Sequence, residues 1–301
     1  MKDYSTIITE DVEIQPVYAA IYGPPGVGKT TLFSSFPKPL LIDIEVGSKN
    51  IQVKRLVPKT YDDVVSMLLW TIDQTQFESV GVDSVSRLEA LIWQRVCSDR
   101  GWIDIEDPGY GKGYNVALHY WEKMFEIFDK IHAAGKHLVL IGHSEVKTIN
   151  DPLKVDPYDK HQIRLQKSAF ALLREKCSMV MYADKDQILH KSKGASKAKI
   201  VGEERVLYTS GGPGFDGKNR YDMPDRLPLD FGEFWAAYTA KSESAESLLK
   251  SIEELLPEVE ESKRVAIKTY IKTISKDQKA LKLALNRTRV LTTKGEKKDA
   301  V

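Results

Sequence analysis

The residues best suited to chemistry lie near the start of the chain, in a glycine-rich stretch that contains a lysine and two threonines. This stretch consists of Gly23, Pro24, Pro25, Gly26, Val27, Gly28, Lys29, Thr30 and Thr31, and it fits the spacing G-x-x-x-x-G-K-[ST]. Glycines let successive backbone N–H groups curl around a phosphate, and the N-terminus of a following helix adds partial positive charge. We expect Lys29 to reach the β- and γ-phosphates of ATP and the Thr30 hydroxyl to bind Mg²⁺. An apolar run before the loop and a helical pattern after it favour this interpretation over a glycine-rich turn that binds nothing.

Two acidic residues could complete such a site. Asp83 follows the apolar run 79–82 and would hold the metal as the acid of a Walker-B strand. Hydrolysis also needs a group that orients or deprotonates the attacking water. In AAA+ proteins a glutamate directly follows the Walker-B aspartate, but Ser84 stands there, which counts against that class even though the glycine-rich loop resembles theirs. Glu45, at the end of the run 40–45, is therefore the predicted catalytic base.

The elements that must position these residues alternate between short apolar runs and helical patterns. This alternation is typical of βαβ units and predicts an α/β fold with a mainly parallel sheet flanked by helices. The predicted strands cover residues 17–22, 39–42, 79–82, 137–141 and 179–182. They are nearly continuous in apolar residues, as suits strands covered on both faces. An apolar stripe from Val116 to Ile131 predicts a helix that begins near Asn115 and ends at Gly135.

Two glycine- or proline-containing stretches interrupt the pattern. Residues 101–114 hold four glycines, and residues 144–160 hold two Asp-Pro steps, so both are predicted to be long loops on one rim of the sheet. Hairpins are expected around 191–199 and 209–224, followed by a short helix over 231–238.

Several runs resemble the bacterial RecA recombinase core. Residues 41–48 (LIDIEVGS) and 82–88 (VDSVSRL) resemble its strand-end glutamate that activates water and its Walker-B strand. Residues 138–144 (LVLIGHS) resemble the strand whose polar end senses the γ-phosphate. His143 stands where that family has an amide side chain, so it is either this sensor or an ordinary strand-end histidine.

A lysine and an arginine further on resemble a cation pair of RecA-like ATPases and ring helicases. Those proteins insert such a pair into the nucleotide site of the neighbouring subunit, and the resemblance implies this role for Lys218 and Arg220. Two cations on one face of a strand could stabilise charge on a transferred phosphoryl group. The interpretation requires an oligomer, and the alternative is a basic turn on the surface.

Residues 17–240 as a whole resemble phage-encoded nucleotide-binding proteins of the RecA-like P-loop group, which include single-strand annealing recombinases of the Sak type. The resemblance implies a RecA-like ATPase core over residues 1–240, DNA-stimulated hydrolysis, a homo-oligomeric ring or filament, and single-stranded DNA and single-strand binding protein as partners. The residues expected to contact DNA are Tyr110, Lys112, Tyr114, Lys147, Lys191 and Lys193. Flexible loops and a merely solvated charged hairpin remain alternatives.

The C-terminal segment, residues 241–301, is predicted to form two or three charged amphipathic helices. Residues 243–261 contain seven acidic residues and one lysine, whereas residues 262–298 contain twelve basic and two acidic residues. The basic part could contact nucleic acid, with a steep salt dependence, or it could pair with the acidic part.

Composition excludes several other classes. The 301 residues are 42% hydrophobic and 29% charged with a net charge of +1, and no apolar run is long enough to span a membrane. The N-terminus carries acids where a signal peptide is apolar, and the two cysteines lack C-x-x-C spacing, so we expect a cytoplasmic protein without disulfides or structural zinc.

Two alternative functions remain at this stage. One is a nucleotide-regulated assembly or motor ATPase that does not bind DNA. The other is a small-molecule phosphotransferase, which is less favoured because the irregular stretches offer lysine and tyrosine instead of the arginines that a lid over phosphates needs.

Overall fold

The computed structural model describes residues 15–150, 156–190, 199–240 and 245–275, together with the single positions 281, 284, 285, 288 and 291. These residues belong to two compact units, one covering 15–235 and the other covering the described part of 236–301. Within the part of the chain that the structure describes, no helix is both long and apolar enough to cross a lipid bilayer.

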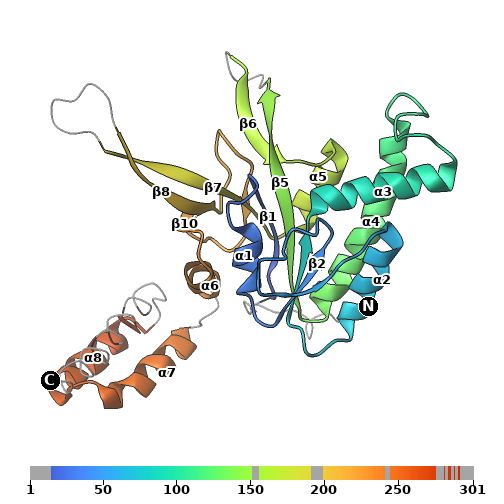
Figure 1. Cartoon of the computed structure of the whole chain (residues 1–301). Coiled ribbons are helices and arrows are strands. Elements are labelled where there is room, and N and C mark those ends of the chain that lie inside the picture. Colours follow the sequence, from blue (N-terminus) through green and yellow to red (C-terminus); the bar gives the residue numbers. More distant parts are fainter. Residues whose placement is uncertain are drawn as a thin grey trace, which may run out of the picture. The chain divides into compact units, whose positions relative to one another are not determined.

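A mixed sheet forms the centre of the larger unit. Its strands are β1 (Tyr18–Gly23), β2 (Pro39–Asp43), β3 (Lys54–Leu56), β4 (Ser79–Asp83), β5 (His137–Ile149), β6 (Tyr158–Ile163), β7 (Met179–His190), β8 (Lys199–Tyr208), β9 (Lys218–Asn219) and β10 (Arg226–Pro228). In the described residues the order is β10-β8-β7-β1-β5-β4-β2-β3, with β6 on β5 and β9 on β7 (Figure 1). The six strands from β7 to β3 in this order are mutually parallel, and the other pairings are antiparallel. The predicted α/β class and its five strands are confirmed; β3 was not predicted.

Helices cover the sheet on both faces. They are α1 (Lys29–Ser34), α2 (Tyr61–Ile72), α3 (Val85–Arg100), α4 (Lys112–Ala133), α5 (Lys167–Lys176) and α6 (Phe231–Thr239). Apolar side chains of α2 to α5 share one buried cluster with Tyr18, Ala20 and Tyr22 of β1. On the other face, Phe33 of α1 packs over Gly81 of β4, where a β-carbon would lie 2.6 Å from the phenyl ring. This double cover explains why β1, β4 and the first half of β5 are nearly continuous in apolar residues, whereas the edge strand β3 is not.

Where the structure describes the stretch 144–160, it is not the long loop that the Asp-Pro steps suggested; residues 151–155, which include the first of these steps, lie outside the described residues. β5 continues to Ile149 and pairs with β6 in an antiparallel hairpin, from Ser144 opposite Ile163 to Ile149 opposite Tyr158. Polar cross-strand contacts stabilise it, such as the Thr148 hydroxyl donating to Asp159 Oδ1 at 2.8 Å. The prediction was wrong because this hairpin is mostly polar, whereas the strand signal in the rest of the sheet is apolar.

The loop predicted over residues 101–114 ends earlier than expected, because α4 begins at Lys112 and not near Asn115. Gly113 lies in its first turn and packs against the preceding loop, where a β-carbon would come within 1.8 Å of the Ile105 carbonyl oxygen. Glycine weakens helices in isolation, so only this tertiary contact explains a helical glycine here.

The hairpin expected around 191–199 is formed by β7 and β8, with Tyr182 opposite Tyr208 and His190 opposite Lys199. The predicted residues Lys191 and Lys193 lie outside the described residues. The short helix expected over 231–238 is confirmed as α6.

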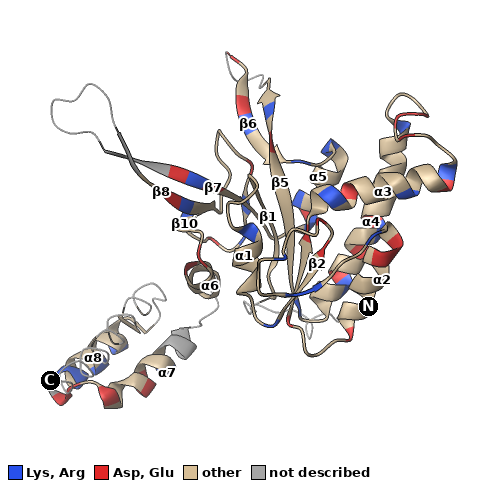
Figure 2. Ribbon diagram, viewed as in Figure 1, with Lys and Arg blue, Asp and Glu red and all other residues tan. Residues whose placement is uncertain are grey.

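The smaller unit contains helices α7 (Ala245–Leu255) and α8 (Glu261–Thr273), joined by the short 3₁₀ helix η2 (Leu256–Glu258). Its own apolar cluster joins Ile252, Ile271 and Leu281, so the predicted amphipathic helices are confirmed over these ranges. Acidic residues lie on α7 and η2 and basic residues along α8 (Figure 2). Whether the basic face binds nucleic acid stays a prediction.

Candidate functional site

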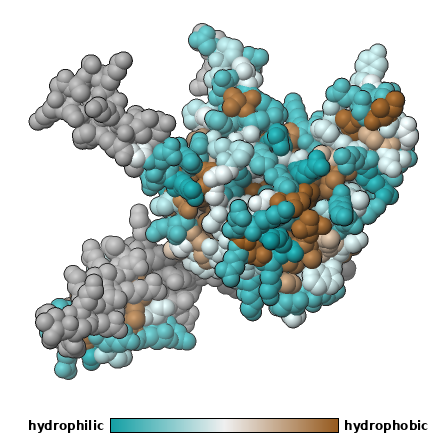
Figure 3. Space-filling model, in the orientation of Figure 1, coloured by the Kyte–Doolittle hydropathy of each residue, from teal (hydrophilic) through white to brown (hydrophobic). Residues whose placement is uncertain are grey.

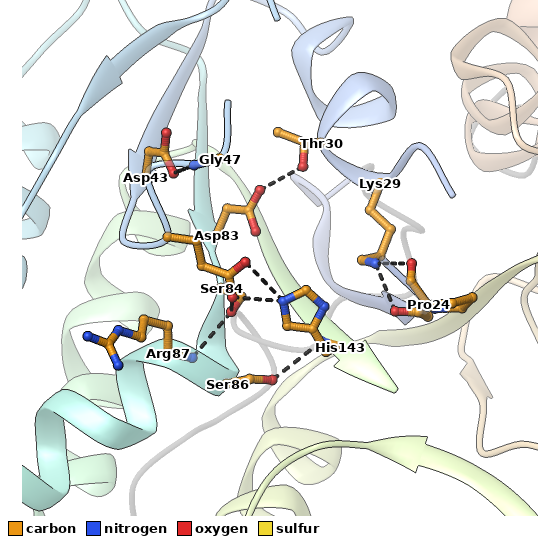
Figure 4. Close-up of polar contacts among 12 residues, drawn as sticks. Pro24, Lys29, Thr30, Asp43, Gly47, Asp83, Ser84, Ser86, Arg87 and His143 are labelled. Carbon is orange, nitrogen blue, oxygen red and sulfur yellow. Dashed lines mark hydrogen bonds and ion pairs between the residues drawn. The ribbon is translucent and has the colours of Figure 1, made fainter. Parts of the chain in front are cut away.

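The glycine-rich loop connects β1 to α1 and is shaped by two close approaches. A β-carbon on Gly23 would lie 2.0 Å from the Ala183 carbonyl oxygen, so only glycine fits there. Gly28, the N-cap of α1, has a φ of +119°, which L-residues with side chains rarely adopt. The loop folds back on itself, because Lys29 Nζ donates to the Gly23 and Pro24 carbonyl oxygens at 2.8 Å each (Figure 4).

A cavity of about 390 Å³ opens at this loop and collects residues from several elements. It is lined by Pro25, Gly26, Gly28, Lys29, Thr30, Thr31, Glu45, Gly47, Ile51, Asp83, His143 and Arg205. Strand register explains the convergence, since Gly23 pairs with His143 and Asp43 pairs with Asp83 at the carboxyl ends of parallel strands. Val27 of the loop is buried in the core and does not line the cavity.

Lys29 is the buried cation of this cavity. Burial lowers its pKa to about 8, against the opposing effect of the Asp83 and Glu45 carboxylates. An anionic phosphate beside the amine would favour the charged form and so offset the burial cost.

Asp83 and Thr30 form an oxygen pair suited to a hard cation. The Thr30 hydroxyl donates to Asp83 Oδ2 at 2.6 Å, and burial raises the pKa of Asp83 above its ordinary value. A hydroxyl and a carboxylate are the donor types that Mg²⁺ takes alongside substrate phosphates, so this pair fits the expected metal.

Glu45 lies in a tight turn after β2 that Asp43 closes. The buried Asp43 carboxylate accepts hydrogen bonds from Gly47 N and Ser48 N at 3.2 Å each and from Ser48 Oγ at 2.6 Å. Arg55 of β3 then donates to the Ser48 carbonyl oxygen at 2.6 Å. The sequence interpretation missed the role of Asp43 in holding this turn. Aspartate side chains commonly close turns by accepting hydrogen bonds from backbone N–H groups a few residues later, here those of Gly47 and Ser48.

Glu45 also contacts the ends of two neighbouring strands. His143 Nε2 lies 2.8 and 2.9 Å from its two carboxylate oxygens, and the Ser84 hydroxyl donates to Oε1. These hydrogen bonds, that from His143 foremost, hold the pKa of Glu45 below its ordinary value despite partial burial. The structure therefore keeps Glu45 ionised and aimed into the cavity, as a general base requires.

His143→Ala should move the acid limb of the pH–rate profile to higher pH. Loss of the His143 hydrogen bond lets the pKa of Glu45 rise, so the carboxylate becomes protonated at a pH where the wild-type protein still has its base. The measurement is kcat against pH for ATP turnover, with His119→Ala as a control because His119 is an exposed residue of α4. An unshifted acid limb would argue against coupling between these two side chains.

The aromatic residues expected to contact DNA lie away from the cavity. Tyr110 is fully exposed in the α3–α4 loop, and the 16 residues of α3 carry that loop about 24 Å from Ser84. The Tyr114 ring packs edge-on against Trp93 at 5.4 Å and its hydroxyl donates to Glu106 at 2.8 Å. Hydrophobic residues lie on the surface near the α3–α4 loop, at the upper right of Figure 3. Base stacking on Tyr114 would have to replace its packing against Trp93, and the role of the exposed Lys112 and Tyr110 stays a prediction.

The predicted basic residues of the later hairpins have varied surroundings. Lys147 of β5 forms an ion pair with Glu145 at 2.8 Å. Lys218 Nζ donates to three carbonyl oxygens at the end of α5, those of Arg174, Glu175 and Cys177. Arg220 is exposed and makes no side-chain hydrogen bond or ion pair with any described residue. Neither Lys218 nor Arg220 lines the nucleotide cavity of its own chain, and a role in a neighbouring subunit stays a prediction.

A second cavity, of about 640 Å³, adjoins the turn that carries Glu45. It is lined by Ile44, Glu45, Val46, Ser86, Arg87, Glu89, Ala90, Trp93 and Arg164. Arg87 and Arg164 are exposed and make no side-chain hydrogen bond or ion pair with any described residue, although the charge of Arg164 helps to lower the pKa of Glu45. Burial raises the pKa of Glu89 to about 7, and its carboxylate accepts a hydrogen bond from Gln166 N. The sequence interpretation did not bring Arg87 and Arg164 together, because they come from separate elements.

A family model, AAA_24, described as an AAA domain, matches residues 15–221. No curated protein matches the chain.

Proposed function

Because this chain belongs to the AAA domain family and its core is that of a nucleotide-binding ATPase, we propose that it binds MgATP in the 390 Å³ cavity and that single-stranded DNA stimulates hydrolysis. The finer proposal is a phage-type RecA-like recombinase or annealing ATPase that acts as a homo-oligomer. The resemblance of residues 17–240 to that group supports it, and also supports single-strand binding protein as a partner.

The predicted site residues of the cavity have different parts in hydrolysis. The loop amides and Lys29 hold the phosphates, and Thr30 and Asp83 would hold Mg²⁺, which when bound neutralises charge on the phosphate oxygens. Glu45 orients the attacking water and accepts its proton, while His143 and Ser84 keep the carboxylate in place.

The observation that carries the DNA proposal is the position of Glu45, which lines both cavities. The second cavity offers two guanidinium groups, Arg87 and Arg164, and the Trp93 indole, which suit backbone phosphates and a stacked base. A strand bound there would contact the turn that holds Glu45. This arrangement supports hydrolysis that depends on DNA.

The test compares ATP turnover with and without single-stranded DNA. We expect stimulation in the wild-type protein, and a loss of most of that stimulation in an Arg87→Ala/Arg164→Ala double variant. If each arginine binds one phosphate, the slope of log affinity against log salt should fall by about 1.4 in the double variant. Arg100→Ala, at the exposed end of α3 and outside both cavities, serves as the control. Equal DNA affinity and equal slopes in double variant and wild type would contradict this assignment.

The alternative function, an oligomeric assembly or motor ATPase that does not bind DNA, is favoured by one observation. Arg220 is an exposed cation without a side-chain partner in the described part of the chain, as a residue that completes a neighbour's site would be. Turnover that is indifferent to DNA but rises with protein concentration would support this alternative.

A further inference from the structure

A second cation lies in the nucleotide cavity besides Lys29, and no motif in the sequence accounts for it. Arg205 lines the cavity together with the glycine-rich loop. It lies in β8, where it pairs with Lys185 of β7, and its carbonyl oxygen accepts a hydrogen bond from Leu229 N at 2.9 Å. The backbone of Arg205 is therefore fixed from both neighbouring segments.

The side chain of Arg205 reaches the loop itself. Its Nη1 atom lies 3.4 Å from the position that a β-carbon would take on Gly28, the residue before Lys29. The guanidinium group thus faces the part of the loop whose amides bind phosphates in this motif.

The charged side chains next to Arg205 on β8 form ion pairs, but that of Arg205 does not. On the same strand, Glu204 forms an ion pair with Arg226 at 2.8 Å and Glu203 forms one with Lys185 at 3.5 Å. The Arg205 side chain has no hydrogen bond or ion pair with any residue that the structure describes. A guanidinium group held at a phosphate-binding loop without a protein partner is suited to an anionic ligand, because its planar donors match phosphate oxygens.

We infer that Arg205 binds the phosphate chain of the nucleotide in cis, within the chain that supplies the glycine-rich loop; the inference rests on the proposed binding of MgATP in this cavity. The β7–β8 hairpin then forms a wall of the nucleotide site. Nucleotide binding would need no arginine from a neighbouring subunit, whatever Arg220 contributes to hydrolysis.

The first test is calorimetric titration with MgADP and with a magnesium complex of a non-hydrolysable ATP analogue. Arg205→Ala should weaken binding of both by about 10- to 100-fold, which is the range for hydrogen bonds to charged groups. Arg205→Lys should recover part of the loss because it keeps the charge. Lys185→Ala, which removes a positive charge from the paired residue outside the cavity, should bind like wild type.

The outcomes separate this inference from the proposed function. If wild type binds the nucleotides and Arg205→Ala binds them equally well, the inference is overturned. If wild type itself fails to bind, the proposed function fails first. Thermal melting of each variant shows whether weaker binding reflects lost contacts or a lost fold.

The second test separates action in cis from action in trans. Subunits with Arg205→Ala mixed with Lys29→Ala subunits should turn over no more ATP than Arg205→Ala alone, because neither chain then has both residues. A gain in turnover on mixing would overturn the assignment in cis. The mixture of Arg220→Ala with Lys29→Ala is the matched comparison, in which the predicted contact in trans should restore activity.

Discussion

Replacing Lys29 by alanine should abolish detectable nucleotide binding, with a loss of affinity of about 100-fold or more. Lys29 is the buried cation at the loop, and the variant loses two kinds of interaction. One is the charge-assisted contacts to the phosphates, and the other is the two hydrogen bonds that tie the lysine to the Gly23 and Pro24 carbonyl oxygens. Calorimetry with MgADP and a non-hydrolysable MgATP analogue measures the effect.

Lys49→Ala is the matched control for this prediction, because Lys49 is an exposed lysine close to the site in the sequence that lines neither cavity. It should bind nucleotide like the wild-type protein. Unchanged affinity in a folded Lys29→Ala variant would show that the phosphates bind elsewhere.

Glu45→Gln should bind nucleotide normally but hydrolyse it about 100- to 10,000-fold more slowly, the usual contribution of a general base. The amide keeps the size of the side chain and an oxygen that can still accept from His143 and Ser84, but it cannot take the proton of the attacking water. The measurement is phosphate release in steady state, alongside nucleotide affinity.

Glu78→Gln serves as the control for this variant, because Glu78 is a surface carboxylate paired with Lys38 at 2.6 Å. Turnover should be unchanged in this control. If Glu45→Gln also retains full turnover, the base is a different residue.

The position of Glu45 explains how a chain with Ser84 directly after Asp83 can still belong to an AAA family. A serine after Asp83 counted against the AAA+ class, yet residues 15–221 match an AAA domain, so the serine does not exclude the chain from that family. The structure gives a physical explanation, because Ser84 donates a hydrogen bond to Glu45. A carboxylate therefore does lie beside the end of β4, but it comes from the turn after β2.

Two local predictions were wrong for reasons that lie in tertiary contacts. Residues 144–149 extend β5 and residues 158–160 begin β6, because cross-strand pairing stabilises strands whose own residues are too polar to be recognised. Helix α4 begins three residues before Asn115, because Gly113 fits against the Ile105 carbonyl oxygen. In both cases the deciding contact is with a residue elsewhere in the chain, which a local pattern does not contain.

The apolar strands and the phosphate-binding loop could be identified from the sequence, because each depends on residues that are neighbours in the chain. The strands are continuous apolar runs that must be buried on both faces. The loop has glycines at a set spacing, which permit its backbone shape. Which side chains meet in the cavity was decided by strand order and register. Parallel pairing of β1 with β5 places His143 opposite Gly23, and the return of the chain through β8 places Arg205 against Gly28. Contacts between such distant residues leave no periodic trace in the sequence, so they became visible only once the sheet was assembled.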